Sequence, residues 1–207
     1  KKVLFYAPLA KRFISSRWSM IDYLQSLIEK GIIENAQLLV RFQPNDFVEM
    51  NEIEKRKNII FDIPGIRFST HMPIGAGIDW DLSQEDIEML TNSLYHCDIL
   101  VSYASSLCID AAIFDKPVVN INFELSVPLS VYRSPTELYK MTHYLNALKT
   151  GAIRLVNNSE ELITWINKYL KNPAIDKDAR ARLVREQCYF LDGMSGKRTA
   201  GFILSNI

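Results

Sequence analysis

Short apolar runs rich in Val, Ile, Leu and Phe recur along the chain, separated by longer stretches of mixed polarity. The two clearest, Ile99-Leu100-Val101 and Val118-Val119-Asn120-Ile121, do not alternate polar and apolar positions. Continuous apolar strands of this kind belong in a parallel sheet that is covered on both faces. The sequence therefore predicts strands over Val3–Ala7, Gln37–Phe42, Ile59–Phe61, Asp98–Tyr103, Pro117–Phe123 and Ile153–Val156.

Two of the intervening stretches begin with recognisable helix caps. Ser83 precedes Asp86 at the spacing of a capping box. The order Ser134-Pro135-Thr136-Glu137 gives another helix a cap, a first-turn proline and an acidic third position. We expect the inward stripes to be Ile87, Leu90 and Leu94 in the first helix and Leu138, Met141, Leu145 and Leu148 in the second, which ends at Gly151.

Three more helices follow toward the end of the chain. One begins at Ser159 and stops at Asn172-Pro173, and a last pair spans Asp176–Phe190 and Ser195–Leu204. Strands separated by helices form right-handed βαβ units. The predicted fold is α/β, a single Rossmann-like, doubly wound and mostly parallel sheet with helices on both faces, and residues 1–207 form one domain.

The composition is typical of a globular protein, and the charge balance argues against nucleic acid as a partner. The chain has 207 residues, of which 48% are hydrophobic and 23% charged, so a disordered or fibrous protein is excluded. The 24 basic and 24 acidic residues leave no net charge, which argues against capture of nucleic acid. No apolar stretch approaches the ~20 residues of a transmembrane helix. Because Lys1-Lys2 precedes the first strand without a Met, we interpret the chain as a segment of a longer protein.

Cysteine and histidine usage gives no metal-binding pattern. The three Cys (Cys97, Cys108 and Cys188) form no Cys-x-x-Cys pair, and the three His are not at ligand-like spacing. We therefore expect buried thiols in a reducing cytosol and no metal.

Charge is unevenly distributed along the chain. Residues 79–98 carry acidic side chains without Lys or Arg, whereas residues 168–198 are predominantly basic. Both segments fit solvated helix faces. The basic segment also fits contact with a neighbouring domain, an acidic substrate or anionic lipid.

The chemically informative segment follows the predicted strand that ends at Tyr103. Two hydroxyl residues, Ser105 and Ser106, occupy the turn, and an apolar helix begins at once. This arrangement points backbone N–H groups and a helix dipole past the carboxyl edge of the sheet, where α/β proteins bind ligands. An anion could bind there, although the serines could equally serve only as caps.

Several common nucleotide and hydrolase motifs are missing from the sequence. It contains no Gly-x-Gly-x-x-Gly, no Gly-x-x-x-x-Gly-Lys-Ser/Thr and no Gly-x-Ser-x-Gly. Any anion bound at the Ser105-Ser106 turn is therefore held in another way.

An ordered set of four segments resembles the carboxy-terminal half of a GT-B-type glycosyltransferase, near the CDP-glycerol glycerophosphotransferase and surface-polysaccharide transferase group. The segments are Lys2-Val-Leu-Phe-Tyr-Ala-Pro8, Leu39-Val-Arg41-Phe-Gln-Pro44, Asp98–Pro117, and the Asp-Gly…Arg segment Tyr189–Arg198. The resemblance covers nearly the whole chain. It implies that this half binds the nucleotide part of an activated donor, while a separate amino-terminal half binds the acceptor.

The resemblance also assigns roles to individual residues. Ser105 and Ser106 would hold the donor diphosphate, and Arg41 would neutralise the leaving nucleotide; a surface salt bridge is the alternative for Arg41. Gln43 lies within the same Arg-x-x-Pro segment and is included with the binding residues. Trp80 could stack on a base or pack at an edge, and the preceding loop at 73–77 could close over a base.

His143 is the one further catalytic candidate. Histidine can pair with a phosphate or act as a general base near neutral pH, and the resemblance places a His-Tyr pair before a glycine turn. The predicted stripe around Met141 and Leu145 instead favours His143 packing at its margin.

Departures from the family pattern leave alternatives open. Related enzymes read Arg-x-His-Pro where this chain has Gln43, and carry an acid where it has Tyr103. We therefore expect a sugar transferase relative rather than a glycerophosphotransferase. The other hypotheses are a nucleotide-sugar epimerase half, with an added carboxylate and His set, and a non-catalytic α/β module.

The donor hypothesis carries further expectations about partners and place in the cell. A nucleotide-diphosphate donor of unknown base is the substrate, with no separate cofactor and no nucleic acid. The chain lacks the acceptor-binding domain, so alone it binds donor without turnover. We expect it in the cytoplasm, with peripheral contact at the inner face of the membrane.

Overall fold

The computed structural model describes residues 1–10, 13–14, 17–44, 46, 48–67, 80–125 and 135–206. The predicted loop at 73–77 and the predicted cap Ser134 lie outside these residues.

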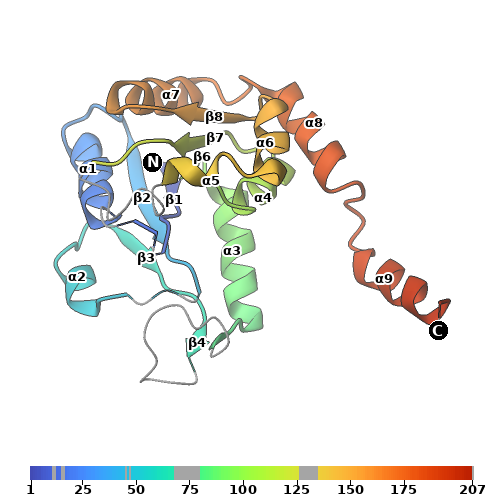
Figure 1. The fold of residues 1–207 in the computed structure, drawn as a ribbon. Helices are drawn as coiled ribbons and strands as arrows, with labels where there is room; N and C mark the ends of the chain where they lie inside the picture. Colours follow the sequence, from blue (N-terminus) through green and yellow to red (C-terminus); the bar gives the residue numbers. More distant parts are fainter. Residues whose placement is uncertain are drawn as a thin grey trace.

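A six-stranded parallel sheet forms the centre of the fold (Figure 1). Its spatial order is β3-β2-β1-β6-β7-β8, and every neighbouring pair is parallel. The fold class predicted from the sequence is therefore confirmed. The strands are β1 (Lys2–Tyr6), β2 (Ala36–Arg41), β3 (Ile60–Asp62), β6 (Ile99–Ser102), β7 (Val118–Ile121) and β8 (Ile153–Val156).

The strand order reverses between β1 and β6, which lie side by side in the middle of the sheet. Chain connections leave in opposite directions at such a point, so a crevice forms beyond the carboxyl ends of the two strands. Leu4, Phe5 and Tyr6 of β1 pair with Ile99, Leu100 and Val101 of β6. All six are fully buried, as expected of central strands with both faces covered.

Helices cover both faces of the sheet (Figure 1). On one face, α1 (Arg17–Glu29) and α7 (Ser159–Lys171) bury apolar side chains against the strands. On the other face lie α3 (Gln84–His96), α4 (Leu107–Ile113), α6 (Thr142–Lys149) and α8 (Lys177–Gln187).

The predicted strands all form, with bounds that differ by at most two residues. Three features were not predicted: α1, the short α2 (Met50–Glu54), and the antiparallel pair β4 (Ile66–Arg67) and β5 (Trp80–Asp81). The antiparallel strands are two residues long, which is too short to give an alternating pattern.

The capping box predicted at the start of α3 is confirmed: Ser83 and Asp86 bond to each other reciprocally. Helix α7 begins at Ser159 as predicted, and Asn158 caps it, since the Asn158 side chain accepts a hydrogen bond from the Glu161 N–H. In α3, Leu94 is buried as predicted, but Ile87 is largely exposed.

The single helix predicted from Pro135 onward is wrong. The chain forms α5 (Pro135–Leu138) and then α6, and the interruption changes which side chains face inward. Met141 and Leu145 are exposed, while Tyr139, Tyr144 and Ala147 are buried. The two tyrosines can be buried because their hydroxyls find hydrogen-bond partners.

The end of the chain leaves the sheet. Helix α9 (Ser195–Leu204) lies away from the rest of the molecule, and none of its residues is buried (Figure 1). The basic segment before it is only partly a solvated face, since Arg180 of α8 is almost fully buried. In the described part of the chain, no helix is long and apolar enough to cross a membrane.

Candidate functional site

A cavity of about 190 Å³ lies at the crevice between the ends of β1 and β6. We call it the switch-point cavity. Its walls come from the segments that follow β1, β2 and β6, from α4, and from Leu82 and Leu90, which lie before and within α3. Arg41, Gln43, Ser105 and Ser106, four of the six site residues proposed from the sequence, line it together with Asp110.

Arg41 is the last residue of β2 and reaches the cavity already paired. Its guanidinium forms an ion pair with Asp62 of β3 and donates a hydrogen bond to the Asp86 carbonyl at 3.0 Å. Burial raises the pKa of Asp62, and the Arg41 charge opposes this shift. The salt bridge considered for Arg41 from the sequence is present, but its side chain is only 6% exposed and borders the cavity.

Gln43 lies in a turn that is stabilised by buried contacts of Asp46 and Arg17. The Asp46 N–H donates to the Gln43 carbonyl at 3.0 Å. The Asp46 carboxylate in turn forms an ion pair with Arg17, and both side chains are almost fully buried. The Arg17 guanidinium also lies over the ring of Phe42, 5.4 Å from its centroid. These contacts fix the segment that carries Arg41 and Gln43.

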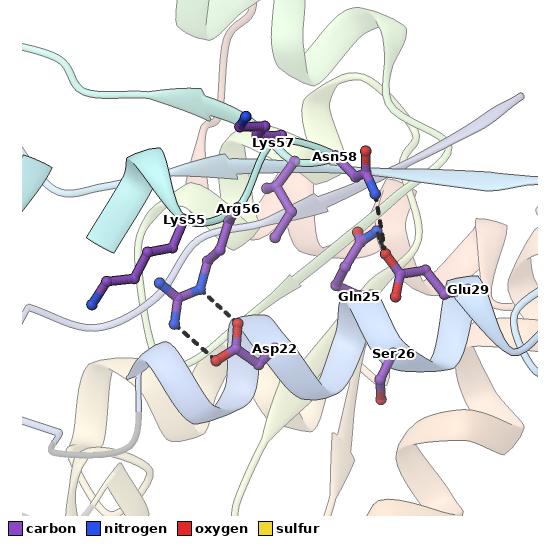
Figure 2. Close-up of a pocket in the computed structure, with 9 residues that line it drawn as sticks. Asp22, Gln25, Ser26, Glu29, Lys55, Arg56, Lys57 and Asn58 are labelled. Carbon is purple, nitrogen blue, oxygen red and sulfur yellow. Dashed lines mark hydrogen bonds and ion pairs between the residues drawn. The ribbon is translucent and has the colours of Figure 1, made fainter. Parts of the chain in front are cut away.

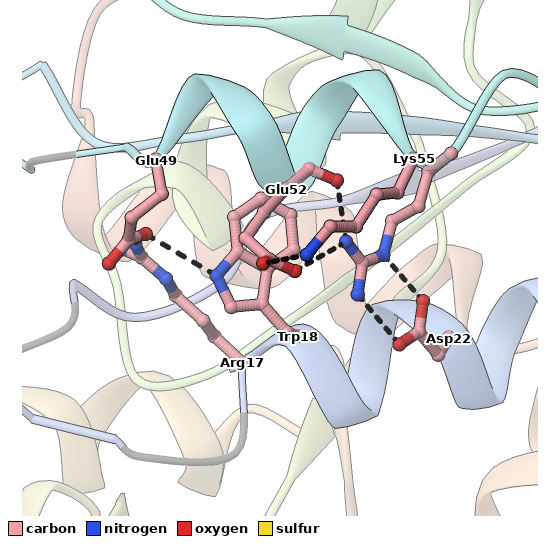
Figure 3. Close-up of polar contacts among 7 residues, drawn as sticks. Arg17, Trp18, Asp22, Glu49, Glu52 and Lys55 are labelled. Atoms are coloured by element: carbon pink, nitrogen blue, oxygen red, sulfur yellow. Dashed lines mark hydrogen bonds and ion pairs between the residues drawn. The ribbon is translucent and has the colours of Figure 1, made fainter.

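The network extends outward along α1 and α2 (Figure 3). Glu49 accepts hydrogen bonds from Arg17 at 2.5 Å and from the Trp18 indole at 3.4 Å. Arg56 lies over the Trp18 ring at 4.6 Å and pairs with Asp22. Glu49 and Arg56 thus both contact the Trp18 ring, and these contacts join α1 to the segment that follows β2.

Ser105 and Ser106, which we call the serine turn, connect β6 to α4. The Ser105 hydroxyl accepts a hydrogen bond from the Leu107 N–H at 3.3 Å. Ser106 is exposed, and its hydroxyl makes no capping bond. Helix α4 has only seven residues, and the hydroxyls of the serine turn line the same cavity as Arg41.

A second cavity, of about 320 Å³, lies on the other side of the serine turn. His143 lines it together with Ser105, Ser106, Gln187 and apolar side chains of α4 to α6. His143 is exposed at the start of α6 rather than packed beside a stripe of Met141 and Leu145. The serine turn thus separates His143 from Arg41.

Trp80 lies in β5 and pairs with Arg67 through the backbone, shortly before α3 begins. The stacking role proposed for Trp80 stays a prediction.

Asp110 is a site residue that sequence reasoning missed. It follows Ser106 by one helical turn, and burial raises the pKa of its carboxyl. That i, i+4 spacing from the serine turn was the available signal. Gln187 gave no such signal, because it comes from the end of α8 and only the tertiary fold brings it to the second cavity.

Another depression, between α1 and the segment that leads into β3, is unlike these cavities (Figure 2). Its main polar groups satisfy one another: Arg56 donates to both carboxylate oxygens of Asp22, at 2.6 and 2.8 Å. Asn58 donates to Glu29 at 3.4 Å. Among the described residues, no three His, Cys, Asp or Glu side chains gather where they could hold a metal ion.

Several solved structures share the fold over the full length of this chain. A variant of the wall teichoic acid polymerase TagF soaked with CDPG aligns with a TM-score of 0.57 and 14% identity, covering 100% of this chain and 42% of that one. A protein assigned as a UDP-N-acetylglucosamine 2-epimerase from Listeria monocytogenes aligns with a TM-score of 0.55 and 15% identity, covering 100% and 45%. The chain thus spans less than half the length of these proteins. No curated protein matches the chain in sequence.

The sequence also matches a protein family. Residues 1–205 match the family described as CDP-glycerol:poly(glycerophosphate) glycerophosphotransferase. The expected likeness to the carboxy-terminal half of a GT-B transferase of surface polymers is confirmed. Gln43 and Tyr103, the departures that favoured a sugar transferase, do not remove the chain from this group. The chain belongs to the CDP-glycerol:poly(glycerophosphate) glycerophosphotransferase family.

Proposed function

We propose that this chain is the donor-binding domain of a glycerophosphotransferase and that it binds CDP-glycerol at the switch-point cavity. The observation that carries the proposal is the meeting of Arg41, Gln43, Ser105 and Ser106 around one cavity at the reversal of strand order. Open α/β sheets bind nucleotides at this location. The description of the family supports CDP-glycerol as the donor.

Each side chain has a role that suits a pyrophosphate. In the transfer, an acceptor oxygen bonds to the phosphorus that carries glycerol, the pyrophosphate P–O bond breaks, and CMP leaves with the electron pair. The hydroxyls of Ser105 and Ser106 would donate hydrogen bonds to phosphate oxygens, and Arg41 would offset the negative charge that develops on CMP. Gln43 would hydrogen-bond the nucleotide at the rim of the cavity.

The acceptor and its catalytic base belong to a part of the protein outside this chain. The chain covers 42% of the TagF chain that it matches, which leaves room for a separate acceptor domain. We therefore expect residues 1–207 to form one domain that binds donor and does not turn it over. Detectable transfer by the 207-residue chain would contradict this part of the proposal.

A titration tests donor binding directly. The chain is titrated with CDP-glycerol, CDP, UDP, GDP and cytidine, and binding is followed by calorimetry and by amide NMR. We expect CDP-glycerol and CDP to bind more tightly than the other ligands, with resonance shifts at Ser105, Ser106 and the segment 41–44. A chain that responds to none of these ligands would overturn the proposal.

Serine variants separate the contribution of the phosphates to binding from that of the nucleoside. Ser105→Ala/Ser106→Ala should weaken CDP binding about tenfold or more, as expected for the loss of two hydrogen bonds to a charged group, and change cytidine binding much less. Ser19→Ala, at an exposed position of α1, is the matched control. Equal losses for CDP and cytidine would contradict the phosphate role.

Asp110 favours a second candidate, a nucleotide-sugar epimerase half. That reaction needs a carboxylate and a histidine near the sugar, and Asp110 is a carboxylate with a raised pKa in the switch-point cavity. His143, however, lines the second cavity. Incubation with UDP-N-acetylglucosamine and analysis of the sugar product distinguishes the two functions, because only an epimerase changes a free donor without an acceptor.

Contact with the inner face of the membrane, in the cytoplasm, remains part of the proposal. The exposed apolar side chains of α9, among them Phe202, Ile203 and Leu204, support it. Co-sedimentation with anionic vesicles tests it, and a chain that stays in the supernatant would contradict it.

A further inference from the structure

A buried polar cluster lies directly behind the serine turn. Asn120, in the middle of β7, has no exposed surface. Its side-chain oxygen accepts a hydrogen bond from the Cys108 thiol at 3.3 Å, and its side-chain nitrogen donates to the Tyr144 hydroxyl. Asn120 of β7 therefore links α4 to α6, with one side-chain hydrogen bond on each side.

The protonation states of the cluster keep these bonds intact at neutral pH. Burial raises the pKa of Cys108 to about 11 and that of Tyr144 well above its ordinary value. The thiol therefore retains the proton that it donates to Asn120, and the phenol stays uncharged while it accepts from Asn120. The Asn120 amide carries both an acceptor oxygen and a donor NH2 group, so it satisfies both neighbours at once.

Stability alone does not require a polar residue at this position. Apolar side chains of similar shape often replace a buried hydrogen-bonded group at little or no cost. What hydrogen bonds add is a fixed geometry between the elements that they join. Here those elements carry the walls of the second cavity: Cys108 follows the serine turn by two residues in α4, and Tyr144 is adjacent to His143 in α6.

We infer that Asn120 is a positioning residue that sets the spacing between the serine turn and His143, acting through Cys108 on one side and Tyr144 on the other. This inference rests on the proposed function, because the serine turn that Asn120 positions is the turn proposed to hold the donor phosphates. Asn120 itself is fully buried and lines neither cavity.

Two tyrosine variants give a matched test. Tyr144→Phe removes the hydroxyl that joins α6 to Asn120. Tyr139→Phe removes a hydroxyl that is also buried but donates to the backbone carbonyl of Ile121 at 2.8 Å, and it leaves the Asn120 bonds to Cys108 and Tyr144 in place. Each variant loses one hydrogen bond of similar burial, so their stabilities should fall by similar amounts.

Binding should separate the two variants. We expect Tyr144→Phe to weaken CDP binding about fivefold, with cytidine binding changed by less than about twofold, and Tyr139→Phe to leave both nearly unchanged. Asn120→Leu should behave as Tyr144→Phe does. Adding Tyr144→Phe and Cys108→Ala to Asn120→Leu should recover stability, since no buried donor is then left unpaired, without recovering CDP affinity.

The amide resonances of Ser105, Ser106 and His143 in the ligand-free chain give a second readout. Tyr144→Phe should shift all three, and Tyr139→Phe should not. Equal effects of the two variants on CDP affinity and on these resonances would overturn the inference. If the wild-type chain binds no nucleotide, the proposed function fails, and the ligand-free resonances alone decide whether Asn120 positions the serine turn.

Discussion

Arg41 and Asp62 face each other across the β2–β3 ladder, and their side chains form an ion pair at the switch-point cavity. The positive charge of Arg41 is therefore partly neutralised before any ligand arrives. A phosphate that binds there competes with the Asp62 carboxylate for the same guanidinium.

Asp62→Asn should remove this competition. We expect CDP to bind roughly two- to fivefold more tightly, since an uncharged amide leaves more of the Arg41 charge for the phosphate. Stability should fall by about 1–3 kcal/mol, because Arg41 is buried and loses its counter-ion. Calorimetry and urea unfolding measure the two effects, with Glu54→Gln, an exposed change of equal charge, as the control. Weaker CDP binding in Asp62→Asn would mean that Asp62 positions Arg41 rather than competing for it.

The two serines of the turn should respond differently to alanine. Ser105 accepts a backbone hydrogen bond from Leu107, so Ser105→Ala should cost about 0.5–1 kcal/mol of stability. Ser106 makes no such bond, so Ser106→Ala should leave stability within about 0.5 kcal/mol and still weaken CDP binding about fivefold. Urea unfolding and calorimetry on both variants check this division. A loss of stability without a loss of affinity in Ser106→Ala would restrict the turn to a structural role.

Arg180 should be a major contributor to stability despite lying in a basic segment. Its guanidinium bonds to Asp115 at 2.8 Å and to the carbonyls of Ile175 and Pro173, both at 2.7 Å. Arg180→Met leaves these acceptors unpaired and should cost roughly 2–4 kcal/mol in urea unfolding. Arg185→Met, at an exposed position of the same helix, should change stability by less than about 0.5 kcal/mol. Similar losses of unfolding free energy in the two variants would show that the buried hydrogen bonds of Arg180 add nothing to stability.

The capping box of α3 should make stability depend on acidic pH. Hydrogen bonds from the Ser83 backbone and side chain lower the pKa of Asp86. A lowered pKa in the folded state stabilises the fold above the unfolded value near 4, and this contribution is lost as pH falls below it. Asp86→Asn should therefore be less stable than the wild type at pH 7 by about 0.5–1 kcal/mol and equally stable near pH 2.

Thermal unfolding between pH 2 and pH 7 checks the Asp86 prediction. Glu85→Gln serves as the control, because Glu85 also carries a charge in the first turn of α3 but is exposed and takes no part in the box. If Glu85→Gln shows the same pH dependence, the effect comes from helix charge and not from the cap.

The sheet could be predicted from the sequence because its strands are buried on both faces. Val118, Val119 and Ile121 are all fully buried, and a strand in that environment needs an almost unbroken apolar run. Asn120 interrupts the run and is also buried, because its polar atoms are satisfied from α4 and α6. A single sequence does not reveal such partners, so the role of Asn120 could be seen only in the structure.

The helices were less predictable where the apolar spacing allowed either of two faces to be buried. The stripe through Leu138, Met141 and Leu145 has good helical periodicity, but the chain buries Tyr139 and Tyr144 instead. The large rings fill more of the space against the sheet, and their hydroxyls find acceptors or donors there. Tertiary packing thus decided between two faces that local pattern could not separate.

The serine turn is a wall of two cavities at once. A displacement of Ser105 and Ser106 that widens the cavity on the Arg41 side narrows the cavity on the His143 side. We therefore expect occupancy of one cavity to change the affinity of the other for its ligand, by the same factor in both directions. Two fragments of a donor that each fill one cavity should for this reason bind cooperatively. The affinity of either fragment should differ measurably when the other fragment is already bound.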